Sequence, residues 1–98
     1  MMVYIDKDFK PIVPSYLENI KQQIMHIRSL LYSKKYREIE RVAMQIRDSG
    51  HNYGFIRIGE LGVSMIYFSG LEASESIIKA ICEIEEYIGK CEIEYIEL

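Results

Sequence analysis

Two histidines and two cysteines are the side chains of this sequence best suited to proton exchange, phosphoryl transfer or metal binding. His26 and His51 carry imidazole, the usual group for proton or phosphoryl exchange near neutral pH. Cys82 and Cys91 lie nine positions apart, with no second cysteine pair and no nearby histidine, so they match neither a zinc pattern nor a disulfide framework. We therefore expect two reduced thiols, no metal and no cofactor.

Sequence signatures of catalysis are missing. The chain contains no G-x-x-x-x-G-K-[ST] loop, no G-x-S-x-G motif and no H-E-x-x-H motif. The glycine-bearing run GHNYGFIRIGELG follows a predicted helix rather than a strand, which argues against a phosphate-binding loop. We expect that the chain is not an enzyme.

The composition predicts one globular domain, residues 1–98, because 49% of the residues are hydrophobic and 28% are charged. No apolar run approaches the roughly 20 residues that span a bilayer. The start MMVYIDKDFK lacks the pattern of a signal peptide. The expectation is a cytoplasmic protein without membrane contact.

Charge is distributed unevenly along the chain. Residues 20–57 contain eight Lys or Arg and three Asp or Glu, whereas residues 71–98 contain two and eight. The acidic part would repel phosphates wherever the basic part attracted them, so nucleic-acid binding is not expected.

Apolar residues recur at three- and four-residue spacing in four segments, which predicts four amphipathic helices. The stripes are Leu17, Ile20, Ile24, Ile27 and Leu31; Tyr36, Ile39, Val42, Ala43 and Ile46; Ile58, Leu61, Met65 and Phe68; and Ile77, Ile81, Ile84 and Ile88. Short connections between helices favour an all-α, antiparallel up-down four-helix bundle.

The predicted bundle covers about residues 15–89. Ser15 with Glu18 three residues later matches a capping box, so the first helix should begin there. The second should run from about Lys35 to Ser49, with the following glycines turning or loosening the chain, although a helix that continues through them is possible at about 1 kcal/mol per glycine. The third should end at Gly70 and the fourth at residues 89–90.

Both termini are predicted to be short extended segments. CEIEYIEL alternates polar and apolar residues as a strand does, and MVYIDKDF is a candidate partner strand or arm. An alternative is that the C-terminal strand pairs with another copy and forms a homodimer.

Met44 is expected on the solvent side of the second helix. At 100° per residue it lies roughly 140° from the centre of the apolar stripe. Arg37, Arg41 and Asp48 fall on the same side. A flexible, polarizable thioether among charges is more natural as a contact surface than as core.

The segment AMQIRDSGHNYGFIRIGELG resembles the signature helix pair of histidine-containing phosphotransfer (HPt) domains of bacterial two-component phosphorelays. The matching positions are Ser49, Gly50, Tyr53, Gly54, Phe55, Leu61 and Gly62, together with Pro14, Leu17, Glu18 and Asn19 in the first predicted helix. The similarity extends from Pro14 to Tyr87. It implies a four-helix bundle whose partner is a response-regulator receiver domain or a histidine kinase.

The sequence departs from the HPt pattern where that family carries its chemistry. Met44 stands at the position of the phosphoacceptor histidine, Arg47 replaces a lysine, and Asp48 replaces a small residue that is usually glycine. A thioether cannot accept a phosphoryl group in such a relay. The carboxylate of Asp48 would repel an incoming phosphoryl group by about 1 kcal/mol at 4 Å in water.

The leading hypothesis is therefore an HPt-like module that docks on a receiver or kinase without phosphoryl transfer. Its expected docking residues are Arg37, Arg41, Met44, Arg47, Asp48 and His51. Two alternatives remain: an active phosphotransfer protein that uses His51, and a structural or oligomerisation module.

Overall fold

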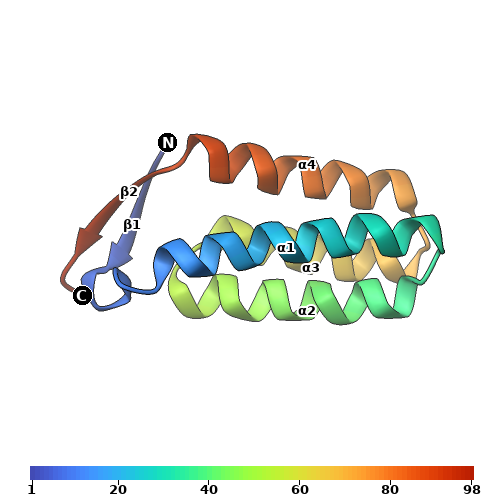
Figure 1. The fold of residues 1–98 in the computed structure, drawn as a ribbon, viewed down its shortest axis with the longest axis horizontal. Helices are drawn as coiled ribbons and strands as arrows, with labels where there is room; N and C mark the ends of the chain where they lie inside the picture. Colours follow the sequence, from blue (N-terminus) through green and yellow to red (C-terminus); the bar gives the residue numbers. More distant parts are fainter.

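The predicted apolar stripes form four helices in a computed structural model that describes residues 1–98. These are α1 (Val13–Tyr32), α2 (Tyr36–Tyr53), α3 (Ile56–Gly70) and α4 (Ser74–Lys90). The helices lie side by side, and two short strands lie at one end of the molecule (Figure 1). The prediction of a four-helix fold with extended terminal segments is confirmed, and the molecule measures 42 × 21 × 19 Å.

The predicted capping box at the start of α1 is wrong. The helix begins two residues earlier, at Val13. Pro14 lies in its first turn, where backbone N–H groups have no partner within the helix, so the N–H that proline lacks is not needed. The Ser15 hydroxyl donates a hydrogen bond to the Ile12 carbonyl at 3.0 Å instead of accepting one from the helix. Glu18 lies near Lys21, 4.0 Å away.

The predicted end of α2 at Ser49 is also wrong, because the helix continues for a further turn to Tyr53, as in the alternative of a helix that runs through the glycines. Gly50 is a buried helical residue and does not turn the chain. Gly54 is the residue that caps the end of the helix, and its φ of 85° is the left-handed conformation that glycine adopts without strain.

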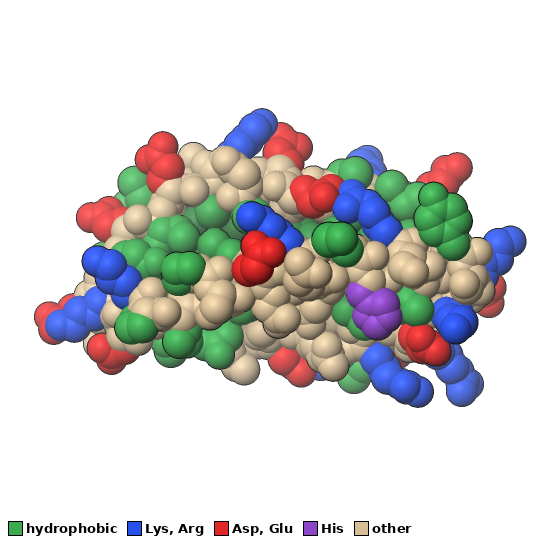
Figure 2. Space-filling view, in the orientation of Figure 1, with side chains coloured by type: hydrophobic (Ala, Val, Ile, Leu, Met, Phe, Trp, Pro, Cys, Tyr) green, Lys and Arg blue, Asp and Glu red, His purple; other side chains and the backbone are tan.

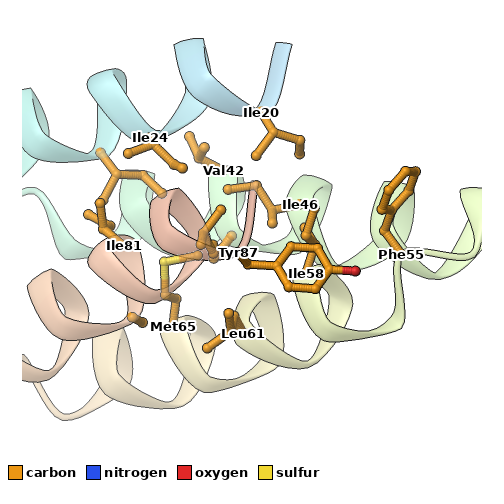
Figure 3. Packing of buried hydrophobic residues seen from close by; sticks show 14 of the residues in the cluster. Ile20, Ile24, Val42, Ile46, Phe55, Ile58, Leu61, Met65, Ile81 and Tyr87 are labelled. Atoms are coloured by element: carbon orange, nitrogen blue, oxygen red, sulfur yellow. The ribbon is translucent and has the colours of Figure 1, made fainter. Parts of the chain in front are cut away.

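The core is one cluster of 20 buried hydrophobic residues from all four helices and β1. The isoleucines of the predicted stripes other than Ile88 are buried in it, and Figure 3 shows Ile20, Ile46 and Ile81 converging from different helices. Five other residues of the predicted stripes are only partly buried and pack at its edge: Leu17, Leu31, Tyr36, Phe68 and Ile88.

Helices α2 and α3 approach each other closely at glycines. A β-carbon placed on Gly50 would lie 2.5 Å from the backbone nitrogen of Gly59. One turn away, a β-carbon on Gly62 would lie 2.6 Å from the backbone nitrogen of Arg47. Gly59 and Gly62 therefore permit the close approach of α2, and Gly50 is the matching glycine on α2.

The terminal segments pair with each other as a two-stranded parallel sheet. β1 (Met2–Asp6) lies beside β2 (Glu92–Ile96), with Met2 opposite Glu92. The predicted C-terminal strand and its N-terminal partner are thus confirmed. The fold is mostly helical but contains this sheet.

One face of the sheet packs on the helices. Ile5 is fully buried, and its side chain faces Gly54 at the turn between α2 and α3. A short 3-10 helix, η1 (Lys7–Phe9), follows β1 and packs Phe9 edge-on against Tyr53, with ring centroids 5.3 Å apart. The N-terminal segment therefore covers the end of the helices where α2 meets α3.

Two ion pairs join neighbouring helices at the surface. Arg28 of α1 pairs with Glu85 of α4, and the hydrogen bond from Arg28 lowers the pKa of that carboxyl. Arg57 of α3 pairs with Glu83 of α4 at 2.8 Å.

In Figure 2, hydrophobic side chains gather between α4 and the first half of α1, with charged side chains around them. None of the helices combines the length and apolar character needed to cross a bilayer.

The buried side chain of Tyr16 provides a pH test of the packing of the core. Burial raises the pKa of Tyr16 to about 12, and the nearby Ser49 side chain offsets only part of that effect. Because the folded protein favours the neutral phenol, this stabilisation is complete below pH 10 and is lost as the pH rises toward 12. We expect the free energy of unfolding to fall by about 2 kcal/mol across that range. Urea titrations should show a smaller fall for Tyr16→Phe, and an equal fall would contradict this assignment.

Candidate functional site

The six predicted docking residues all lie on α2, and the structure brings them to one side of it. Five of them follow each other at alternating four- and three-residue steps and are exposed: Arg37, Arg41, Met44, Asp48 and His51. At 1.5 Å per residue this row is about 21 Å long. Arg47 lies beside the row, toward α3, and is half-buried.

Met44 lies near the middle of this row and is 40% exposed, as predicted. Its side chain helps to line a shallow hollow of about 350 Å³ with Arg37, Glu40 and Arg41. Because two arginines border the hollow and only one carboxylate joins them, its rim carries more positive than negative side chains. Protein contact surfaces commonly combine apolar side chains with a polar rim.

Arg47 and Asp48 are partners of each other. The Arg47 Nε atom lies 2.8 Å from a carboxylate oxygen of Asp48 and donates a hydrogen bond to it. This pair offsets part of the repulsion that an isolated Asp48 would exert on a phosphate. It also engages the Nε atom of the Arg47 guanidinium.

His51 does not extend freely into solvent. Its Cε1 and Nε2 atoms would each lie 2.8 Å from a β-carbon placed on Gly59, so this end of the ring rests against α3 where the helix has no side chain. The imidazole thus lies over the seam between α2 and α3. Sequence spacing put His51 on the face of Met44, but it could not reveal this contact with α3.

The structure adds exposed apolar residues of α3 that the sequence analysis did not assign to the site. Ile56, Val63 and Tyr67 lie on the outer side of that helix, and Tyr67 is 65% exposed. Gly50 of α2 faces Gly59 of α3, and one turn further along, Arg47 faces Gly62. One more turn in the same direction reaches Met44 on α2 and the segment between Val63 and Tyr67 on α3, so these residues lie at the same level. We call Met44, Val63 and Tyr67 the apolar patch.

A sequence signal for this patch exists. The α3 segment IRIGELGVSMIYFSG contains only two charged residues, so it is apolar nearly all round although one side meets solvent. A helix with that composition is normally covered on every side. Its exposed apolar side is therefore unusual and makes it a candidate contact surface.

The remaining chemistry-bearing residues do not join the site. His26 is exposed on α1, Cys82 is exposed on α4, and Cys91 is a half-buried thiol whose pKa is raised by burial. No group of three or more His, Cys, Asp or Glu side chains is arranged to hold a metal ion.

Comparison with known proteins yields no match. No family model matches the chain, and no curated protein or solved structure is similar to it at a significant level.

Proposed function

We propose that this chain is a degenerate HPt-like module of a bacterial two-component pathway. In this proposal it is a cytoplasmic, antiparallel up-down four-helix bundle that docks on a receiver domain or histidine kinase without carrying phosphate. The observation that carries the proposal is the exposed Met44, which stands where the resemblance requires the phosphoacceptor histidine. Docking residues on α2 are Arg37, Arg41, Met44, Arg47, Asp48 and His51.

The composition of the apolar patch supports docking. Protein interfaces combine an apolar centre with a polar rim. Here Met44, Val63 and Tyr67 supply the centre, and Arg37 and Arg41 belong to the rim. Methionine adapts its shape to a partner, so a surface centred on it suits contact without chemistry.

The alternative acceptor, His51, fits less well. The Nε2 end of its ring rests against Gly59, so an incoming phosphoryl group would reach that nitrogen only after the side chain rotates away from α3. A phosphoacceptor needs an accessible nucleophilic nitrogen. In our proposal His51 is a contact residue at the end of the docking row.

The docking proposal is tested by calorimetric titration against receiver domains from the same genome. We expect one or more receivers to bind, and Met44→Glu to weaken that binding at least tenfold, because the substitution replaces an apolar contact at the interface centre by a carboxylate that must lose its hydration. Met25→Glu is the matched control, since Met25 is 60% exposed on α1, away from the site. Equal losses for the two variants, or no binding receiver, would count against the proposal.

A further inference from the structure

The sheet formed by β1 and β2 has an open edge. β2 pairs with β1 alone, and no backbone hydrogen bond joins β2 to any helix or turn. Glu92 donates its backbone N–H to Met1, on the β1 side. Alternate residues of a strand direct their backbone groups to opposite sides, so those of Ile93 and Tyr95 face the open edge. Such unpaired groups are a template for another strand.

The side chains along this edge are acidic on one face and apolar on the other. Glu92 and Glu94 point outward, are exposed, and take part in no ion pair and no side-chain hydrogen bond. Ile93 and Tyr95 point inward and pack against the core cluster. Acidic side chains are also prominent at this end of the molecule in Figure 2. The strand therefore offers two free carboxylates spaced by about 7 Å and an apolar inner side.

The outward face of the neighbouring strand extends this surface. Met2 lies opposite Glu92 and Tyr4 lies opposite Glu94 in the parallel register, and Tyr4 is 58% exposed. Lysine and arginine side chains bury their methylene groups on apolar surface while their charged ends reach carboxylates. Basic side chains from an added strand would lie beside the carboxylates of β2, and the apolar side chains of β1 would lie one strand further on.

We propose that the open edge of β2 binds an extended segment of a partner protein in which Lys or Arg alternates with apolar residues. The backbone of that segment would pair with Ile93 and Tyr95. Its basic side chains would lie next to Glu92 and Glu94, since opposite charges on neighbouring strands attract. The third strand would also strengthen a sheet that is otherwise at the lower limit of size.

The same charges disfavour a second copy as the occupant. A symmetric antiparallel pairing of two β2 strands centred on Glu94 would set the Glu94 carboxylates of the two copies directly opposite each other. Like charges in that arrangement are destabilising. A homodimer through the terminal segments is therefore the less favourable use of this edge.

The test uses the full chain and a short synthetic peptide in which lysine alternates with valine. We expect binding with new protection from hydrogen exchange at the Ile93 and Tyr95 amides, because these groups gain partners. A scrambled peptide of the same composition should bind at least tenfold more weakly, since it cannot place its charges on one face. Equal binding of the scrambled peptide, or no new protection at these amides, would overturn the proposal.

Charge-reversal variants provide the matched control. The double substitution Glu92→Lys with Glu94→Lys should weaken peptide binding about tenfold. Glu72→Lys with Glu75→Lys makes the same change in net charge at exposed positions before and at the start of α4, and should have a small effect. Similar losses for both double variants, or sedimentation showing a dimer that the Glu92 and Glu94 substitutions abolish, would contradict the proposed occupant.

Discussion

Substituting Gly50 by alanine should lower the free energy of unfolding by about 2 kcal/mol or more. The new methyl group would lie 2.5 Å from the Gly59 nitrogen and 2.9 Å from its Cα atom, so α2 and α3 must move apart. Overpacking destabilises by about 1–3 kcal/mol, and we expect the upper end of that range because the clash is with backbone atoms that cannot rotate away. After the gain of about 1 kcal/mol in helix propensity, a net loss of about 2 kcal/mol remains. Thermal unfolding followed by circular dichroism should show a midpoint lower by about 10 °C.

Gly89 is the control for that experiment. It lies in α4 and a β-carbon there would meet no atom within 4 Å. Gly89→Ala should therefore raise stability by up to about 1 kcal/mol, since alanine favours the helix. If Gly50→Ala stabilised the protein as Gly89→Ala does, the close approach of α2 and α3 would be refuted.

Restoring the HPt pattern should create a phosphoacceptor. The triple substitution Met44→His, Arg47→Lys and Asp48→Gly puts an exposed imidazole on the docking row and removes the nearby carboxylate. A phosphorylated receiver that binds the chain should then transfer its phosphoryl group from its aspartate to the new imidazole nitrogen. We expect an acid-labile label on the variant and none on the native chain, measured with radiolabelled phosphate.

Two further variants make this result specific. Adding His51→Ala to the triple variant should leave the label in place, whereas the label should disappear when position 44 is again methionine. A labelled native chain that loses its label in His51→Ala would support the alternative acceptor instead. A triple variant that binds the receiver but stays unlabelled would show that position 44 does not correspond to the phosphoacceptor.

The periodic apolar stripes made the four helices predictable from sequence. Ile20, Ile46 and Ile81 are buried where the 3.6-residue period puts them, because burying apolar surface dominates over local preferences. Helix ends depend on smaller terms. The chain could satisfy the first turn of α1 through Pro14 as well as through Ser15, and only the structure shows which start was taken.

The continuation of α2 through Gly50 has a tertiary cause. A glycine inside a helix is locally unfavourable by about 1 kcal/mol, which is why its sequence suggests a break. Contact with Gly59 compensates, but that contact depends on the packing of α3. The parallel direction of the pairing between β1 and β2 could not be predicted from the sequence either, because it depends on where the packed helices place the two ends of the chain.

The candidate site was predictable in part. The period of α2 put Met44, Asp48 and His51 on one face, and the structure confirms that Met44 is exposed. Pairwise contacts such as Arg47 with Asp48 depend on rotamers that sequence does not specify. Val63 and Tyr67 were not predicted as site residues, because they come near Met44 only when α3 packs against α2.

The proposal that the face of α2 and α3 is a docking surface is tested most directly by NMR titration of the isotope-labelled chain with a receiver that binds it. We predict that signal changes concentrate at Met44, His51, Val63 and Tyr67. They should be small on the outer side of α4, for example at Ile78, which is also exposed. Changes centred on α4, with the Met44 region unaffected, would contradict the proposed docking surface.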